Sequence, residues 1–262
     1  MIFLFRRESV FIDNHCHVLG EYYDNIDEVI KKCKAAKVEK IIVSGTNIKT
    51  NREVLELVNK YDIVYGTIGF HPTELDDFTD TYFAWLEANI NNKKIIGIGE
   101  IGLDYHYDNT DKKLQIMVFK RQLDIAKKYH KSVIIHSRDS TRDTYNILKD
   151  YKLSGVIHCF SGSVEMAREF IKIGYYIGIG GIITYKNAKN IKEVVKEIPL
   201  SYILLETDSP YLAPEPYRGK ENNPSNIPLI AEAISGIKSV SITEVAAVTT
   251  ANSRAVFDFF NK

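Results

Sequence analysis

The sequence predicts an α/β fold, a (β/α)8 TIM barrel with extra C-terminal helices. Short runs rich in β-branched residues alternate with longer amphipathic segments, and no linker interrupts this alternation. Eight such runs can be counted, which is the number of strands that closes a barrel of this kind. The length of 262 residues also matches the about 250 residues of a typical barrel. We therefore expect one domain over residues 1–262, with residues 1–9 as an N-terminal extension.

The expected strands and helices follow one another along the chain as this fold requires. The strands are predicted at residues 10–13, 40–44, 63–68, 94–99, 132–135, 155–157, 175–179 and 202–205. Helices are expected between them, and within residues 111–130 the apolar side chains keep to one face at the helical period. Prolines mark residues 209–228 as a long loop, where a barrel enzyme can shape its substrate pocket. From Ile227 onward the chain predicts two or three helices, one of which begins with a capping box of Ser241 and Glu244.

The composition limits the partners and the compartment of the protein. Thirty-four Lys and Arg residues balance thirty-four Asp and Glu residues, so a polyanion must be held by local charges or by metal. The three cysteines are too few and too scattered for a disulfide framework, which favours a reducing, cytoplasmic setting. No stretch approaches the about 20 apolar residues of a membrane span. We expect no membrane association and no obligate protein partner, with the nucleus as an alternative compartment in a eukaryote.

Two histidines follow the first expected strand. His15 and His17 flank Cys16, so at strand spacing their rings point to one side while Cys16 points away. Two imidazoles on one side can share a metal ion. A His-x-His pair also arises by chance among seven histidines, but its position at a strand end favours a metal site.

A glutamate follows the fourth expected strand. If strand alternation holds, Glu100 shares one face with Ile96 and Ile98, while Gly97 and Gly99 share the other. A carboxylate in line with two core isoleucines is unfavourable to bury without a partner. A metal ion would remove this penalty, and a carboxylate with two oxygens can bridge two ions. The alternative is an ordinary ion pair between this glutamate and a neighbouring arginine.

Three further strands end in side chains that can bind metal. His136 and His158 follow the fifth and sixth expected strands, and either one alone is more often a hydrogen-bonded core histidine. Their position at successive strand ends, in register with Glu100, favours a shared site. Asp208 follows the eighth strand and is expected to ligate metal and to take a proton from water. Glu206 lies deeper on the same face and is expected to be a supporting hydrogen-bond partner.

Six motifs occur in order along the chain. They are His15-x-His17, Gly69-Phe70-His71-Pro72, Gly99-Glu100-Ile101-Gly102-Leu103-Asp104-Tyr105, His136-Ser137-Arg138-Asp139, His158-Cys159-Phe160-Ser161-Gly162 and Glu206-Thr207-Asp208-Ser209-Pro210-Tyr211-Leu212. This series strongly resembles the TatD family of metal-dependent deoxyribonucleases, which are TIM barrels of the amidohydrolase kind. The resemblance runs from Ile12 to about Phe260, and it is more specific for the family than for the substrate.

The resemblance implies that six side chains bind two divalent metal ions. These are His15, His17 and Asp208 on one ion, His136 and His158 on the other, and Glu100 between the two. The implied catalytic residues are Asp208, Glu100 and His71. Imidazole-rich sites suit Zn²⁺ or Mn²⁺, whereas phosphodiester cleavage is often run on Mg²⁺, so the sequence leaves the metal open.

The implied reaction is hydrolysis of phosphodiester bonds in DNA by water that the binuclear centre activates. Family members are described as 3′-to-5′ exonucleases that prefer single strands, with roles in DNA repair and in DNA fragmentation during cell death. The expected partner is therefore the 3′ end of single-stranded DNA. The alternatives are a deacylase of mischarged aminoacyl-tRNA, a small-molecule amidohydrolase with the same site, and a non-catalytic scaffold. A lost ligand would favour the scaffold, and all six positions are intact.

Polar and aromatic side chains around these motifs are expected to bind the substrate. They are His71, Arg138, Arg218, Lys220, Asp104 and Tyr105. Arg218 and Lys220 resemble the family's basic loop and can clamp a phosphate, the alternative being a solvated surface loop. His71 would donate to phosphate or act as a general acid, the alternative being a loop histidine packed on Pro72. Tyr105 or Phe160 would stack a base.

Overall fold

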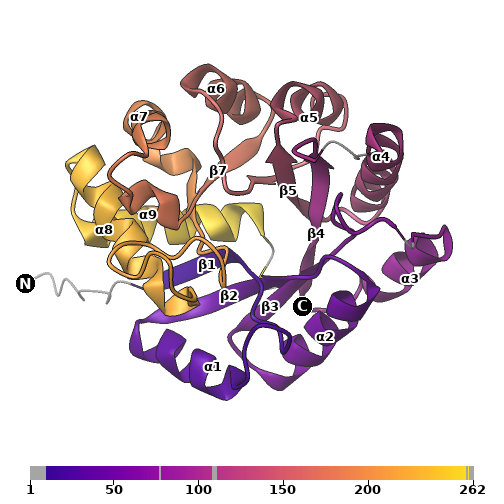
Figure 1. The fold of residues 1–262 in the computed structure, drawn as a ribbon, viewed down its shortest axis with the longest axis horizontal. Coiled ribbons are helices and arrows are strands. Elements are labelled where there is room, and N and C mark those ends of the chain that lie inside the picture. Colours follow the sequence, from indigo (N-terminus) through magenta and orange to yellow (C-terminus); the bar gives the residue numbers. More distant parts are fainter. Residues whose placement is uncertain (1–9, 77, 108–110, 258, 260–262) are drawn as a thin grey trace, which may run out of the picture.

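Eight parallel strands form one sheet in which neighbours in sequence are also neighbours in space. The structure, a computed structural model, describes residues 10–76, 78–107, 111–257 and 259, and the expected extension at residues 1–9 lies outside them. The strands pair in the order β1 to β8. They are β1 Phe11–Cys16, β2 Val38–Ser44, β3 Val64–Ile68, β4 Ile95–Asp104, β5 Ser132–Arg138, β6 Gly155–Ile157, β7 Tyr175–Ile179 and β8 Ile203–Leu205. Figure 1 shows these strands as a ring with the helices outside it, which is the expected TIM barrel.

Helices connect the strands and cover the outer surface of the barrel (Figure 1). They are α1 Ile26–Ala35, α2 Ile48–Lys60, α3 Thr81–Asn89, α4 Lys112–Lys128, α5 Thr141–Leu148, α6 Val164–Lys172, α7 Lys189–Glu197, α8 Ile227–Lys238 and α9 Ile242–Val256, with short 3₁₀ helices η1 Gly181–Thr184, η2 Leu200–Tyr202 and η3 Pro224–Asn226. The expected C-terminal helices are thus α8 and α9 in the described part of the chain. The side chain of Ser241 accepts the N–H of Glu244 at 3.1 Å and so caps α9.

The ring closes where the chain that follows β8 meets β1. The N–H of Asp208 donates to the carbonyl of His15 at 3.0 Å. The side chain of Asp13 accepts from the N–H and from the hydroxyl of Thr207, at 2.9 and 2.5 Å, across 194 positions of sequence. These contacts fix the C-terminal end of the barrel, which is the end where enzymes of this fold carry their active sites.

One apolar cluster fills the inside of the barrel. It consists of Ile12, Ile42, Ile96, Ile134, Val156, Leu204, Val256, Phe257 and Phe259. Ile98 belongs instead to the larger cluster between the strands and the helices. The register between β3 and β4 shifts between Ile95 and Gly97, so strict alternation fails between Ile96 and Ile98. The prediction that Ile96, Ile98 and Glu100 share one face is therefore wrong for Ile98.

The predicted strand positions are confirmed, while several boundaries differ. The sixth and seventh strands have the predicted limits, at residues 155–157 and 175–179. The first, fourth and fifth strands extend further, so His15, Glu100 and His136 lie within strands and not after them. Pro228 lies in the first turn of α8, so the loop predicted at residues 209–228 ends earlier than expected.

The described helices are all too short or too polar to cross a membrane. Cys16, Cys33 and Cys159 are free thiols, and the first two are buried. The assignment of residues 1–262 to one domain stays a prediction.

Candidate metal centre

Six side chains that can bind metal converge at the C-terminal end of the barrel. They are His15 in β1, His17 after β1, Glu100 in β4, His136 in β5, His158 after β6 and Asp208 after β8. Each of these four histidines has a ring nitrogen 2.8 to 3.8 Å from a carboxylate oxygen of Glu100. The structure therefore brings together all six side chains that the sequence analysis named as candidate ligands, because parallel strands present their C-terminal ends at one face of a barrel.

His15 and His17 direct the same ring nitrogen to one point. Their Nε2 atoms are 3.1 Å apart. They lie 3.4 and 3.3 Å from Glu100 Oε2, and 3.5 and 3.6 Å from Asp208 Oδ1. Two ring nitrogens and two carboxylate oxygens thus surround a common point, which is a donor set suited to a divalent cation.

Ser44, the last residue of β2, fixes the other nitrogen of each of these rings. Nδ1 of His17 lies 3.0 Å from the carbonyl oxygen of Ser44, which can only accept, so this nitrogen carries the proton. Nδ1 of His15 lies 3.0 Å from the hydroxyl of Ser44. The Nδ1–H of His17 is thus engaged by the backbone and its Nε2 is directed to the cluster, the arrangement found in metal-binding histidines. A cation at the common point would attract these ring nitrogens and carboxylate oxygens together, so the residues fit a metal ion.

Glu100 lies between two groups of imidazoles. Its Oε2 faces the first histidine pair, whereas its Oε1 lies 2.8 Å from Nδ1 of His136 and 3.5 Å from Nε2 of His71. The residue is 3% exposed. Within the described residues its ion-pair partners are histidines, not the arginine of the alternative interpretation. Each oxygen of Glu100 thus belongs to a different group of donors. A carboxylate that bridges two metal ions has the same arrangement.

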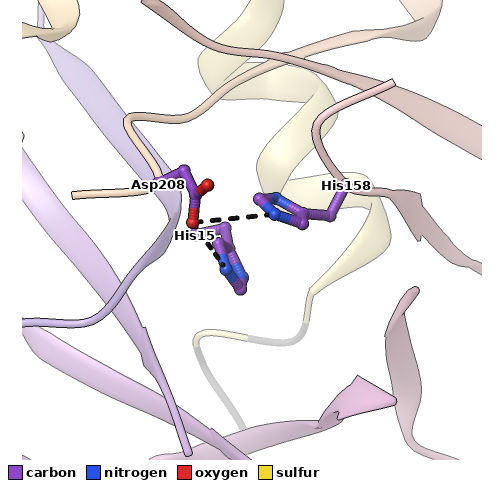
Figure 2. A group of neighbouring side chains, drawn as sticks. All are labelled: His15, His158 and Asp208. Atoms are coloured by element: carbon purple, nitrogen blue, oxygen red, sulfur yellow. Dashed lines mark ion pairs between the residues drawn. The ribbon is translucent and has the colours of Figure 1, made fainter. Parts of the chain in front are cut away.

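His158 shares Asp208 with His15. Oδ1 of Asp208 lies 3.5 Å from Nε2 of His15 and 3.7 Å from Nε2 of His158, and Figure 2 shows both rings turned toward this carboxylate. The rings of His15 and His158 are 3.7 Å apart between centroids. His136 instead groups with Glu100 and His71. Nε2 of His158 also lies 3.8 Å from Oε1 of Glu100, the oxygen that faces His136. The implied sharing of one ion by His136 and His158 therefore stays a prediction.

Asp104 holds His136 from the side opposite Glu100. Its Oδ2 lies 2.9 Å from Nε2 of His136, and its Oδ1 accepts the N–H of His106 at 2.9 Å. The sequence analysis expected Asp104 to bind substrate, but both of its oxygens are engaged within the protein and the residue is 2% exposed. This arrangement favours a role in orienting the ring of His136.

The buried carboxylates of the cluster favour positive charge near them. Burial disfavours the charged form of Glu100, but the imidazoles of His71, His15 and His158 outweigh it and hold the pKa of Glu100 well below its usual range. Burial also disfavours the charged form of His15, yet Glu100 and Asp208 raise its pKa well above the usual value. Burial lowers the pKa of His136, but hydrogen bonds with Asp104 and Glu100 raise it to about 9. Divalent cations would satisfy the same carboxylates that here attract protons.

Glu206 supports His158 from below, as its position on the strand face predicts. Its Oε1 lies 3.1 Å from Nδ1 of His158 and accepts the N–H of Cys159 at 2.5 Å. A Cβ atom at Gly178 would lie 2.4 Å from Oε2 of Glu206, so glycine is required there to admit the carboxylate. Glu206 is fully buried, and its carboxylate lies beside the side of the His158 ring that faces away from Glu100 and Asp208.

We predict that Glu206→Gln weakens metal binding by about 10-fold, because partners behind a ligating histidine contribute about 10- to 100-fold in metal affinity. Competitive titration with a chromogenic chelator measures this change. Glu193→Gln, which removes an exposed carboxylate on α7, is the matched control. Equal metal affinity in the two variants would remove Glu206 from the support of the site.

His71 lies beside the second donor group. The N–H of Thr73 donates to Nδ1 of His71 at 3.2 Å, so neutral His71 carries its proton on Nε2, which faces Glu100. Burial and the neighbouring His136 lower the pKa of His71, which favours this neutral form. The ring packs against His136 with centroids 4.3 Å apart. His71 thus offers an N–H donor to a ligand in the cluster.

The remaining predicted substrate contacts lie outside the cluster. Arg138 ends β5 and is exposed, with its guanidinium 5.8 Å from the ring centroid of Tyr107. Arg218 and Lys220 are exposed on the loop after β8, and the guanidinium of Arg218 lies 4.3 Å from the ring centroid of Tyr185. All three cations therefore lie at or after the C-terminal end of a strand, at the end of the barrel that carries the candidate metal ligands.

Tyr105 is turned away from the metal ligands. Its hydroxyl donates to Asp143 on α5 at 3.1 Å, and Lys112 lies 4.2 Å from its ring centroid. Phe160, the other residue expected to stack a base, is 6% exposed and packs near Phe170. The structure thus brings neither aromatic ring into the cluster.

Three residues near the centre were missed by sequence reasoning. Ser44 is a polar residue at the end of an apolar strand, which is the same signal that singled out His136. Asp13 is a carboxylate two residues before a candidate ligand, which could have identified it. Tyr211 had no distinguishing signal, because its place beside His17 depends on the path of a loop.

Comparison with known proteins agrees with the geometry. A family model described as TatD related DNase matches residues 12–258. The uncharacterized metal-dependent hydrolase YabD of Bacillus subtilis is 43% identical over 252 residues, which cover 95% of this chain and 99% of YabD. The metal-dependent hydrolase YcfH of Escherichia coli is 35% identical, with 94% of this chain and 95% of YcfH covered. The crystal structure of YjjV, a TatD homologue from Escherichia coli, has a TM-score of 0.91 at 31% identity, covering 95% of this chain and 98% of that chain. This chain therefore belongs to the TatD family of metal-dependent hydrolases.

Proposed function

We propose that this chain hydrolyses phosphodiester bonds of DNA and removes nucleotides from the 3′ end of a single strand. The observation that carries the proposal is the position of Glu100, whose two oxygens face two groups of imidazoles. Such a carboxylate suits two divalent ions, and two-ion centres are well suited to displacement at phosphate. The description of the matching family model as TatD related DNase supports DNA as the substrate.

The proposed cofactors are two divalent ions, Zn²⁺, Mg²⁺ or Mn²⁺. His15, His17 and Asp208 would hold one ion, and His136 the other, with Glu100 between them. His158 lies 3.7 Å from Asp208 and 3.8 Å from Glu100, so it is within reach of either group. Bound there, the ions would polarise the phosphate, activate a water molecule and offset the charge that develops in the transition state.

Asp208 is proposed as the base that orients or deprotonates the attacking water. Its side chain is 14% exposed, whereas that of Glu100 is 4% exposed, so Asp208 is the more accessible of the two carboxylates. Burial disfavours the charged form of Asp208, but His158 and His15 outweigh it and lower its pKa. The carboxylate is therefore ionised near neutral pH, as a base must be.

His71 and the exposed cations are proposed to hold the substrate. The Nε2–H of neutral His71 would donate to a phosphate oxygen beside Glu100. Arg138, Arg218 and Lys220 would bind neighbouring phosphates of the strand, since a chain without net charge must attract DNA through local cations. The guanidinium groups of the two arginines suit phosphate because each can form two parallel hydrogen bonds, whereas Lys220 would contribute a point charge.

The proposal is tested with 5′-labelled single strands that carry a free or a blocked 3′ end, and with the corresponding duplex. The protein is stripped of metal and reloaded with Mg²⁺, Mn²⁺ or Zn²⁺, and the Glu100→Ala variant controls for contaminating nucleases. We expect a ladder that shortens from the free 3′ end and is absent with the blocked strand and with the variant. Cleavage of aminoacyl-tRNA or of amides, with DNA left intact, would overturn the proposal in favour of a deacylase or an amidohydrolase.

A further inference from the structure

Tyr211 is an exposed aromatic side chain beside the candidate metal centre. It is 48% exposed, and its ring centroid lies 6.2 Å from that of His17 at an interplanar angle of 69°. Burial of its own ring therefore does not account for its position. An aromatic face that remains open next to a metal ligand is available to a bound substrate.

Contacts at both ends hold Tyr211 in place. Its N–H donates to the carbonyl of Asp208 at 2.9 Å, and its carbonyl accepts from Nδ2 of Asn222 at 2.7 Å. Asn222 is fully buried and also donates to the carbonyl of Thr207 at 2.9 Å. The hydroxyl of Tyr211 donates to that of Tyr22 at 3.0 Å, with ring centroids 5.7 Å apart at 70°. The ring is thus fixed at its backbone and at its hydroxyl before any ligand binds.

We propose that Tyr211, held by Tyr22, is a stacking subsite for the unpaired base of the nucleotide next to the scissile phosphate. Aromatic side chains bind single-stranded nucleic acid in this way because every base has a π face. A ring that is already ordered loses little conformational entropy when a base stacks on it. Because Tyr211 lies three residues after Asp208, a base on its ring places the attached phosphate near the carboxylates.

The same loop also supplies a cation for the strand. Arg218 follows Tyr211 on the segment between β8 and η3 and lies over the ring of Tyr185. The hydroxyl of Tyr185 donates to the carbonyl of Ala213 at 2.8 Å, which ties this segment to the chain after η1. One loop therefore carries a base-stacking ring and a phosphate-binding guanidinium, the two kinds of contact that a single strand needs.

The subsite rests on the proposed function, and its test separates the two. The whole chain is compared on two labelled single strands that differ only in the terminal nucleotide at the attacked end, which is thymidine or an abasic tetrahydrofuran unit. Dissociation constants are measured by fluorescence anisotropy in the presence of a chelator, and kcat/KM is measured with metal. We expect Tyr211→Ala to weaken binding of the thymidine strand about 10-fold, or about 1.4 kcal/mol, and of the abasic strand less than about twofold.

Further variants separate stacking from folding. Tyr211→Phe keeps the ring and should bind within about threefold of the natural chain, whereas Tyr211→Leu keeps bulk without a π system and should resemble the alanine variant. Tyr202→Ala is the matched control, because this exposed tyrosine precedes β8 at the opposite end of the barrel and has a ring partner, Tyr176, at 5.9 Å. If Tyr211→Ala lowers the melting temperature of the protein, binding of the two strands is compared between the Tyr211→Leu and Tyr211→Phe variants instead.

The possible outcomes distinguish the stacking subsite from the proposed hydrolysis of DNA. If Tyr211→Ala weakens binding of the thymidine strand much more than binding of the abasic strand, the stacking subsite is established. Equal losses on both strands, or no loss on either, overturn the subsite and leave DNA hydrolysis standing. If the natural chain cleaves neither strand with any of the three metals, DNA hydrolysis fails and the subsite fails with it.

Discussion

Replacing Glu100 by alanine is expected to lower turnover by about 10³-fold or more, the upper range for removing one electrostatic contribution to a transition state. The same change is expected to remove one equivalent of bound metal. The reason is geometric, since each oxygen of Glu100 faces a different group of imidazoles and no other carboxylate in the described cluster does so. Steady-state kinetics and elemental analysis of the purified variant measure the two effects.

Two further variants serve as controls for Glu100→Ala. Glu100→Gln keeps the shape of this buried side chain and removes its charge, so it separates loss of a charged ligand from loss of packing. Glu193→Ala on α7 removes an exposed glutamate and should leave turnover unchanged. A Glu100→Ala variant that binds two ions and keeps its activity would show that Glu100 is not part of the centre.

The second large effect is expected for Asp208→Asn, with a loss of about 10²- to 10⁴-fold in kcat, the range for removing a general base. Asparagine keeps an oxygen at a similar position, so metal content should fall less than in Glu100→Ala. KM for DNA should change little, because Asp208 is proposed to act on the attacking water and not on the strand. Separate determination of kcat, KM and metal content tests this combination.

The control for Asp208→Asn is Asp150→Asn, which neutralises an exposed aspartate after α5 that belongs to none of the candidate metal-binding groups among the described residues. It should leave kcat within about twofold, as expected for a surface change away from the site. If Asp208→Asn lowers metal content as far as Glu100→Ala does, Asp208 acts chiefly as a ligand. If its kcat equals that of the control, the proposed base is wrong.

Each histidine of the centre is held from behind by a partner in the barrel. The partners are Ser44 for His15 and His17, Asp104 for His136, and Glu206 for His158. Such contacts fix the orientation of a ligating ring and raise its basicity.

The order of elements could be read from the sequence because each strand is a short apolar run between amphipathic helices. The limits of β6 and β7 were predicted at their observed residues. The end of β4 was not, because this strand continues past Gly99 through a shift of register against β5 between Ile98 and Ile101. Bulges of this kind depend on how adjacent strands pair, and a single run of sequence carries no record of that pairing.

The ligand positions could also be read from the sequence, whereas their grouping could not. His158 lies beside Asp208 and His15 because the chain after β8 closes against β1. Asp104 turns toward His136 because the register of β4 against β5 places these two residues near one another. Both contacts depend on the rotation of the strands about the barrel axis, which sequence spacing does not determine.

The sequence by itself determined which side chains lie at the strand ends and that these ends share one face of a barrel. Strand position and parallel order follow from local apolar patterning, so His15, Glu100, His136 and Asp208 could be named without coordinates. The tertiary structure alone decided which donors face which oxygen of Glu100, and that Tyr211 stands open beside His17. The physical reason is that register shifts, ring closure and loop paths are set by contacts between residues far apart in the chain, and local patterning does not encode those contacts.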